Sequence, residues 1–215
     1  MNKLIIFDLD GTLIHSVPDI LEQVNITLAH FNYPLCTENQ IRQYIGNGAR
    51  NLIKRCFGDL TEEDLDQKLA FYNKIYTACG SPKTHVFEGM DEVLVKLKKM
   101  GYKLAILTNK PQMTTDKVYQ KYLSQYGFDM VVGQSANVKC KPDKTSTLNI
   151  LRELNVSEEN AYFIGDGQTD IETAYNSNIK HIAVLWGYRD KDQLEKARAK
   201  VFAHKPSDIL DIINS

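Results

Sequence analysis

The sequence predicts an α/β protein in which a doubly wound parallel sheet has an all-helical domain inserted after its first strand. From residue 103 onward, short β-branched or aromatic runs alternate with segments whose apolar residues recur at helical spacing. Such alternation is typical of parallel strands joined by helical crossovers. Between residues 15 and 85 the sequence instead shows helical patterns and no convincing strand. We therefore expect a sheet-based core (1–14 and 86–215) and a helical lid (15–85).

The core strands are expected where short apolar runs end in glycine or polar residues. Such runs occur at residues 4–7, 103–109, 130–133, 161–166 and 181–187. Helices are expected between the later strands, at residues 113–125, 144–155 and 169–176. This order of elements predicts a Rossmann-like sheet of about five parallel strands.

The lid has helix signals of its own. Helices are expected at residues 18–31, 37–57 (interrupted at Gly46-Asn47-Gly48) and 61–79. Pro18 suits a first helical turn, and Thr61 followed by acidic residues is typical of a helix start. Residues 80–85 are expected to lead back into the core as a hinge. Since the insert leaves from the carboxyl end of the first strand, it should lie over that edge of the sheet.

Composition narrows the class of protein. The 215 residues are 43% hydrophobic and 25% charged, with a formal net charge of −1. This balance is that of a globular protein and gives no support for a nucleic-acid or membrane partner. No apolar run approaches the roughly 20 residues of a membrane span, and no signal-peptide pattern is present. The four cysteines form no CxxC pair, so we expect a cytoplasmic protein with reduced thiols.

The first strand ends in the most informative segment, Asp8-Leu-Asp10-Gly-Thr12. Strand geometry places side chains i and i+2 on one side, so Asp8 and Asp10 can converge on one small volume. Two carboxylates that close disfavour each other's ionised form unless a cation or proton intervenes. Open α/β sheets place ligand sites at this edge, which favours a functional site. A plain turn is the alternative, because Asp and Gly are common turn residues.

Two further strand ends supply groups that bind anions. Thr108 offers a hydroxyl at the end of the second core strand, and the helix beginning near Pro111 offers backbone N–H groups. Lys141 comes just before another helix, a position where an anion is the favoured neighbour. The alternatives are an ordinary helix cap at Thr108 and a solvated lysine at 141.

The fourth strand runs into Gly165-Asp166-Gly-Gln-Thr-Asp170. The glycines allow a tight turn around Asp166, and Asp170 begins the next helix. A dinucleotide-binding GxGxxG motif is disfavoured, because Asp170 takes its last position and its charge would repel a pyrophosphate. Acidic residues at both strand ends instead predict a Mg²⁺ site, since Mg²⁺ takes hard oxygen ligands.

The chain resembles the haloacid dehalogenase superfamily through an ordered set of residues: Asp8, Asp10, Thr108, Lys141, Asp166 and Asp170. The four motifs of that superfamily are Asp-x-Asp-Gly-Thr, a Thr or Ser after the second strand, a Lys before a later helix, and Gly-Asp-x-x-x-Asp. The resemblance spans the whole chain and includes an all-helical cap inserted after the first strand. It implies a Mg²⁺-dependent phosphatase that acts on a small phosphorylated metabolite.

The resemblance also implies the chemical steps. Asp8 would attack phosphorus to give an aspartyl-phosphate. Asp10 would protonate the leaving oxygen and then activate the water that hydrolyses the intermediate. Neighbouring carboxylates would favour the protonated form that this requires of Asp10. The presence of Asp10 excludes dehalogenase chemistry, which lacks this second acid in the family.

Further residues would bind the metal and the substrate. The implied Mg²⁺ ligands are the carboxylates of Asp8 and Asp166, the backbone carbonyl of Asp10, and Asp170 either directly or through water. Thr108 and Lys141 would stabilise the charged phosphoryl oxygens. Thr12 and Asn109 are expected to contact the substrate as well.

Within the superfamily the chain is similar to phosphoglycolate phosphatases. Gly46-Asn47-Gly48 resembles their Val-Gly-Asn-Gly element, and residues 185–189 resemble their Trp-Gly-Tyr region. A Gly-Asn-Gly break can aim backbone N–H groups at a ligand, and Arg50 can pair with a substrate carboxylate. A simple turn between helices is the alternative. The chain departs from the family pattern at Lys144, where a second proline is common, and at Gly167, where many members have Ser.

Three other interpretations share part of this pattern. A phospho-receiver domain also gathers Asp, Thr, Lys and Mg²⁺ on a parallel sheet, but it lacks an acid/base equivalent to Asp10. The same fold could serve a pyrophosphatase, a nucleotide phosphatase or a sugar-phosphate mutase. An inactive interaction module would not need the complete catalytic set. We expect a monomer or homodimer that hydrolyses 2-phosphoglycolate to glycolate and phosphate.

Overall fold

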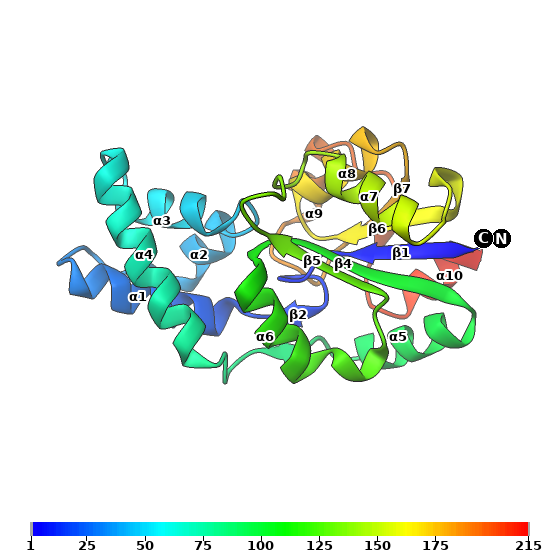
Figure 1. Ribbon diagram of the computed structural model, residues 1–215, viewed down its shortest axis with the longest axis horizontal. Helices are drawn as coiled ribbons and strands as arrows, with labels where there is room; N and C mark the ends of the chain where they lie inside the picture. Colours follow the sequence, from blue (N-terminus) through cyan, green and yellow to red (C-terminus); the bar gives the residue numbers. More distant parts are fainter. Residues whose placement is uncertain (1, 215) are drawn as a thin grey trace.

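The computed structural model describes residues 2–214, which form two parts (Figure 1). Among these residues, one part is a parallel sheet with helices on both faces, and the other is a group of four helices, α1 to α4. The four helices lie at the carboxyl end of the sheet, whereas helix α10 (Asp208–Asn214) lies at the opposite end. The α/β class with a parallel sheet and inserted helices is confirmed.

Within residues 2–214 the main sheet has six strands, in the order β5-β4-β1-β6-β7-β8, and all neighbours are parallel. The strands are β1 (Lys3–Phe7), β4 (Tyr102–Pro111), β5 (Met130–Gln134), β6 (Ala161–Gly165), β7 (Lys180–Val184) and β8 (Phe202–Ala203). Residues 4–7 of β1 are fully buried, because a central parallel strand is covered on both faces. The ends of β1, β4 and β6 therefore come out side by side under the four helices.

Apolar side chains of β1 alternate between the two faces of the sheet, as strand periodicity requires. Ile5 and Phe7 join the cluster formed with α5 (Met90–Lys99), α6 (Gln112–Tyr122) and α10. Leu4 and Ile6 join the cluster formed with α7 (Thr145–Glu153) and α8 (Gln168–Asn176). A short helix, α9 (Lys191–Lys196), covers the β7–β8 side of the sheet. Burial on both faces fixes β1, and with it the position of the residues that follow.

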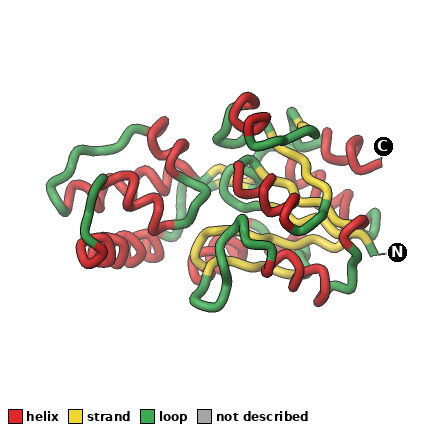
Figure 2. Tube along the Cα trace, turned by 90° about the horizontal axis from the view of Figure 1, so that it is seen from above, coloured by secondary structure: helices red, strands yellow, loops and turns green. Residues whose placement is uncertain are grey.

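The helical group has an apolar core of its own and stands apart from the strands (Figure 2). Its members are α1 (Val17–His30), α2 (Glu38–Tyr44), α3 (Ala49–Phe57) and α4 (Glu62–Cys79). The helices begin where the sequence supplies caps, since Thr37 accepts from the backbone of Gln40 and Thr61 from that of Asp64. One residue of the sheet-based core, Tyr188 from the loop after β7, packs into this cluster.

The segments that connect the two parts pair with each other. Ile14–His15 (β2) runs antiparallel to His85–Val86 (β3). Beside them, the buried carboxylate of Asp19 accepts hydrogen bonds from Lys83 N (3.2 and 3.1 Å) and from Thr84 Oγ1 (2.6 Å). The start of α1 is thus tied to the segment that returns to the core.

Several elements differ from the sequence-based expectation. The sheet gains β8, and helices α5, α9 and α10 were not expected. The expectation of no strand between residues 15 and 85 is wrong at both ends, because His15 and His85 lie in two-residue strands too short to show a period. The strand expected at 181–187 ends at Val184, which leaves the following residues free to reach the helical group. None of the helices in residues 2–214 combines the length and apolar composition needed to cross a membrane.

Candidate active site

Three buried carboxylates meet where β1 and β6 end. Asp8 directly follows β1, Asp166 directly follows β6, and Asp170 lies in the first turn of α8. One oxygen from each carboxylate lies within 4.8 Å of the others. They converge because β1 and β6 are parallel neighbours in register, with Phe7 paired to Ile164. The structure therefore brings together three of the four acidic residues predicted to bind metal.

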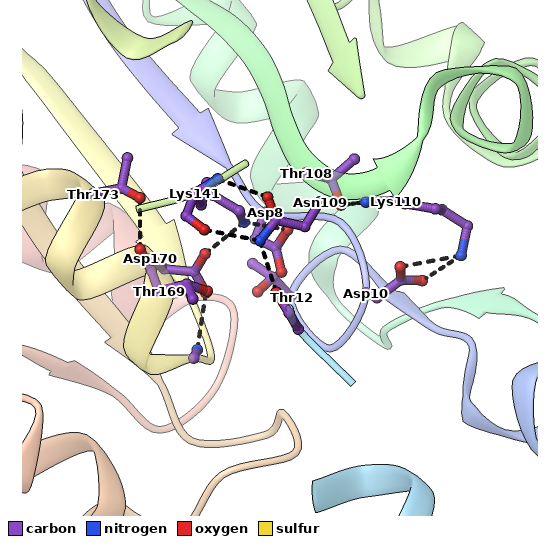
Figure 3. A network of polar contacts seen from close by, with 12 residues as sticks. Asp8, Asp10, Thr12, Thr108, Asn109, Lys110, Lys141, Thr169, Asp170 and Thr173 are labelled. Atoms are coloured by element: carbon purple, nitrogen blue, oxygen red, sulfur yellow. Dashed lines mark hydrogen bonds and ion pairs between the residues drawn. The ribbon is translucent and has the colours of Figure 1, made fainter. Parts of the chain in front are cut away.

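Lys141 contacts two of these carboxylates (Figure 3). Its Nζ is 2.7 Å from Asp8 Oδ1 and 2.6 Å from Asp170 Oδ1, and the lysine side chain is 2% exposed. Lys141 lies between β5 and α7, where Asn109 Oδ1 accepts a hydrogen bond from its backbone N at 2.7 Å. When all groups are ionised, three carboxylates and one ammonium leave a formal charge of −2 in a buried site.

The excess negative charge alters the acidity of the groups. Burial raises the pKa of Asp8 to about 8, with Lys141 acting against this change and Asp170 and Asp166 adding to it. Burial, followed by the charge of Asp170, raises the pKa of Asp166 to about 6. Burial alone would lower the pKa of Lys141, but Asp170 and Asp8 raise it above its ordinary value. The lysine therefore stays charged, and near neutral pH the Asp8 carboxyl retains its proton unless a further cation lowers its pKa.

Backbone groups approach two of the carboxylates closely. A Cβ atom at Gly187 would overlap the side chain of Asp166, and one at Gly165 would overlap that of Asp170. Because glycine occupies both positions, Tyr188 N can donate to Asp166 Oδ2 at 2.7 Å. Glycine is thus required here for close approach to the carboxylates.

The donor set fits a Mg²⁺ ion. Carboxylate oxygens are the hard ligands that Mg²⁺ prefers, and it usually takes few of them together with water. A charge of 2+ would balance the formal charge of −2 left by the three carboxylates and Lys141. Burial is the main cause of the raised pKa values of Asp8 and Asp166, and the charges of neighbouring carboxylates add to it. A bound cation would act against both effects.

The side chain of Asp10 points away from the three carboxylates (Figure 3). Its two oxygens are 3.0 and 3.1 Å from Lys110 Nζ, and Oδ1 also accepts from Ser16 Oγ at 2.5 Å. Lys110 Nζ lies 2.7 Å from Tyr76 Oη, which belongs to α4. The i, i+2 expectation fails for this side chain because the chain has left the strand, and Asp10 instead bridges to Ile14. A lysine, not a carboxylate, is its charged neighbour.

A cavity lies between the sheet edge and the helical group. From the core it is lined by Asp8, Asp10 and the β4 residues Thr108, Asn109 and Lys110. From the helical group it is lined mainly by apolar or aromatic side chains: Ile20, Ile45, Ala49, Leu52, Tyr72 and Tyr76. The predicted nucleophile and the predicted acid/base thus line the same cavity beneath the inserted helices.

Asn109 connects the core to the helical group at this cavity. Its Nδ2 donates to the carbonyl of Gly46 at 2.9 Å and to that of Lys141 at 3.2 Å. Gly46 and Gly48 both line the cavity. Thr108 is buried, lines the same space and accepts a hydrogen bond from Lys110 N at 3.2 Å.

Three predicted substrate residues lie outside the cavity lining. The hydroxyl of Thr12 is buried and donates to Asp166 Oδ1 at 3.4 Å. The carbonyl of Asn47 accepts from the side chain of Asn51. Arg50 is not brought to the cavity, because its guanidinium is directed across the surface to two acidic residues of α4, Glu62 and Asp66. The pairing proposed for Arg50 with a substrate carboxylate therefore has no support in this arrangement.

The loop after β7 makes contacts that the sequence does not reveal. Trp186 Nε1 donates to the carbonyl of Thr12 at 3.1 Å, and Tyr188 Oη accepts from Ser16 N at 3.0 Å. The guanidinium of Arg189 donates to carbonyls at the end of α2, including that of Ile45 at 2.6 Å. The Trp-Gly-Tyr resemblance drew attention to this loop, but only the fold shows that it joins Asp166 to the helical group.

The fold and the site define the class of protein, and comparison with known proteins agrees. Residues 5–184 match the family model of haloacid dehalogenase-like hydrolases. The chain therefore belongs to the haloacid dehalogenase-like hydrolase family.

Within this family, two similar relatives bear the name of a phosphatase. The phosphoglycolate phosphatase of Psychrobacter arcticus is 36% identical over 197 residues, which cover 86% of this chain and 84% of the relative. Phosphoglycolate phosphatase 1 of Pseudomonas aeruginosa is 32% identical over 192 residues, which cover 86% of this chain and 70% of the relative. The chain is a phosphatase of this kind, and the receiver and inactive-module interpretations are set aside.

Solved structures show the same fold. The crystal structure of a Lactobacillus delbrueckii subsp. bulgaricus protein has a TM-score of 0.93 at 25% identity and covers 99% of both chains. A predicted phosphoglycolate phosphatase from Haemophilus somnus has a TM-score of 0.90 at 27% identity, covering 99% of this chain and 98% of the other.

Proposed function

We propose that the protein hydrolyses 2-phosphoglycolate to glycolate and phosphate, with Mg²⁺ and through an aspartyl-phosphate formed on Asp8. The observation that carries the proposal is the position of Asp8, buried at the end of β1 and lining the cavity. Lys141 engages Oδ1 of its carboxylate, and no hydrogen bond within residues 2–214 engages Oδ2. One oxygen is therefore oriented while the other is available to attack phosphorus.

Asp10 would act on the leaving group and then on water. As the Asp8 oxygen bonds to phosphorus, the bond from phosphorus to the leaving oxygen breaks, and that oxygen takes a proton from Asp10. Asp10 then removes a proton from the water that attacks the aspartyl-phosphate, which restores both residues. Ser16 and Lys110 hold the Asp10 carboxylate at the cavity for these steps.

Positive charge and hydrogen-bond donors would stabilise the transferring phosphoryl group. The carboxylates of Asp8 and Asp166, the backbone carbonyl of Asp10, and Asp170 either directly or through water would hold Mg²⁺, which would supply positive charge and keep Asp8 ionised. Lys141 contributes its ammonium beside Asp8, and Thr108 contributes its hydroxyl.

The choice of 2-phosphoglycolate is supported by the relatives, which bear the name of this activity. No observation on the described residues favours a pyrophosphate, nucleotide or sugar-phosphate substrate instead. We also expect the enzyme to act in the cytoplasm as a monomer or homodimer.

Asp8→Asn tests the nucleophile. The amide keeps the shape of the side chain but is a poor nucleophile, so kcat should fall at least about 1,000-fold. Acid-quenched wild-type enzyme should retain labelled phosphate from the substrate, whereas the variant should retain none. Asp91→Asn, an exposed change in α5, is the matched control and should behave as wild type. Substantial hydrolysis by a folded Asp8→Asn variant would overturn the mechanism.

A substrate screen tests the assignment of 2-phosphoglycolate. Initial rates with Mg²⁺ should be measured for 2-phosphoglycolate, pyrophosphate, nucleotides and sugar phosphates. The proposal requires 2-phosphoglycolate to have the highest kcat/KM of the panel. A different leading substrate would reject this assignment while leaving the phosphatase mechanism intact.

A further inference from the structure

Lys110 is the one cationic side chain among the described residues that line the cavity. It is buried, with its side chain 3% exposed, and the mechanism above uses it only to orient Asp10. The helical side of the cavity is mostly apolar. A charged group on the substrate, apart from the phosphate, therefore has no other cation to meet in this space.

Lys110 and Tyr76 together retain hydrogen-bonding capacity. A lysine ammonium has three N–H donors, and Lys110 Nζ contacts both oxygens of Asp10 and Tyr76 Oη. Because the two Asp10 oxygens belong to one carboxylate, a single shared N–H can serve both of them, which leaves one donor of Lys110 for a ligand. Because Tyr76 Oη accepts from Lys110 at 2.7 Å, its own proton remains to be donated. The pair offers two donors next to apolar walls, which is an arrangement suited to a carboxylate.

We propose that Lys110 and Tyr76 bind a carboxylate on the leaving group, so that the enzyme selects phosphate esters of 2-hydroxycarboxylic acids. This inference rests on the proposed hydrolysis by Asp8 and Asp10. Lys110 Nζ is only 3.0 Å from Asp10 Oδ1, and Asp10 protonates the leaving oxygen. A short spacing between the leaving oxygen and the carboxylate, as in an ester of a 2-hydroxycarboxylic acid, matches the short spacing between these two residues.

The position of Arg50 supports the assignment. A second anionic group on the substrate needs a cation, and Arg50 is occupied by Glu62 and Asp66 away from the cavity. Lys110 lies on β4 in the core, whereas Tyr76 lies on α4 in the helical group. A carboxylate bound between them would contact both parts of the molecule and favour their closed arrangement.

A purely structural role for Lys110 makes a different prediction. If Lys110 only orients Asp10, its removal should slow the hydrolysis of every ester by one common factor. If it binds a carboxylate, its removal should affect acidic substrates more than neutral ones. The ratio of kcat/KM between two substrates that differ only in this charge separates the two roles, whatever happens to the common factor.

The experiment compares 2-phosphoglycolate with its uncharged amide, 2-phosphoglycolamide, and with 3-phosphooxypropanoate, whose carboxylate lies one carbon further away. Wild type should favour 2-phosphoglycolate over the amide by about 30-fold or more in kcat/KM, and should favour it over the longer acid. Lys110→Met should reduce the acid-to-amide ratio to about 3 or less, while Lys110→Arg should retain most of it. Lys117→Met should keep the wild-type ratio, because Lys117 is exposed and contacts α4 at the carbonyl of Thr77.

Each outcome decides the proposal. Equal losses on acid and amide in Lys110→Met would overturn it, as would a wild type that does not distinguish them while still hydrolysing 2-phosphoglycolate. A wild type that hydrolyses neither would reject the proposed substrate and this inference together. Should Lys110→Met fail to fold, Tyr76→Phe tests the same ratio with the ion pair to Asp10 in place, and an unchanged ratio there would count against a carboxylate site.

Discussion

At the scale of single residues, the acidic side chains are positioned as much by the backbone around them as by their own strands. Tyr188 N donates to Asp166, and Gly187 has no side chain to push that carboxylate away. Small changes in this backbone should therefore lower the affinity for Mg²⁺ more than they lower the stability of the fold.

Gly187→Ala tests the close approach to Asp166. The added methyl group must displace the carboxylate, so Mg²⁺ affinity measured by calorimetry should fall by about 10-fold or more. Gly101→Ala is the control, because its φ of +83° strains any side chain although no atom lies near the new Cβ. That variant should lose stability and keep its Mg²⁺ affinity; an equal loss of affinity in both variants would contradict the steric explanation.

His181 should make stability depend on pH away from the active site. Burial, followed by the charge of Lys200, lowers the pKa of His181 below its usual 6.5, and its Nε2 accepts a hydrogen bond from Lys200 N. Below about pH 6.5 the unfolded chain binds a proton that the folded chain does not, so the free energy of unfolding falls as pH falls.

Urea unfolding between pH 5 and 8 provides the measurement. His181→Gln should show a shallower loss of stability below pH 6.5 than wild type, and His204→Gln, an exposed change, should match wild type. His15, whose pKa is also lowered by burial and then by Arg42, contributes to the remaining slope in the same direction. Asp8 and Asp166 contribute in the opposite direction, because their raised pKa values favour the folded state as pH falls. The test is therefore the difference between the variant and wild type at each pH. An identical slope in His181→Gln and wild type would refute the prediction.

At the scale of elements, the loop after β7 connects the sheet to the helical group through hydrogen bonds on both sides. Arg189 reaches the end of α2, where unpaired carbonyls favour a cation. The preceding residue, Tyr188, contacts Asp166 through its backbone and Ser16 through its hydroxyl. The arrangement of α2 over the cavity is therefore linked to the metal-binding edge by neighbouring residues.

Arg189→Met should loosen the helical group without altering the reacting groups. Loss of the hydrogen bonds to α2 should raise KM by about 10-fold and change kcat less, because closure over the substrate becomes less favourable. Limited trypsin digestion near Lys83 should also be faster. Arg152→Met, which removes an exposed arginine of α7, should leave both measurements unchanged. An unchanged KM in Arg189→Met would show that the hydrogen bonds of Arg189 to α2 do not contribute to substrate binding.

The elements also show what a sequence can reveal. Asp8 and Asp166 were predictable as neighbours because parallel strands bring their carboxyl ends to one edge, and register alone then sets the spacing. Helix α5 was missed although Met90, Val93, Leu94 and Leu97 repeat at helical spacing, so the signal was present. The contact between Lys110 and Tyr76 could not be predicted, because it depends on how the helical group packs against the sheet edge.

At the scale of the whole molecule, the chain passes between two apolar cores through two short paired segments, β2 and β3. The helical group and the sheet each bury their own cluster, and β2 and β3 connect them. The buried carboxylate of Asp19 supplies the polar part of this connection. Stability should therefore be distributed unevenly between the two parts.

Asp19→Ala tests this connection. The change leaves Lys83 N and the Thr84 hydroxyl without their acceptor, at a cost of about 1–3 kcal/mol for the buried hydroxyl and less for the part-buried N–H. Hydrogen exchange should accelerate mainly in α1 to α4, with little change in β1 and β4. Glu22→Ala removes an exposed ion pair to the same Lys83 and should have little effect; uniform acceleration across the sheet in Asp19→Ala would show that the parts unfold together.

The pairing of β2 with β3 has a consequence for the history of such a chain. Because the segments that leave and re-enter the core lie side by side, the insertion begins and ends at nearly the same point of the core. A helical module of another size grafted at that point would leave the register of β1 and β4 as it is. Substrate specificity can then change through replacement of the helical group, while the reacting residues at the sheet edge keep their positions.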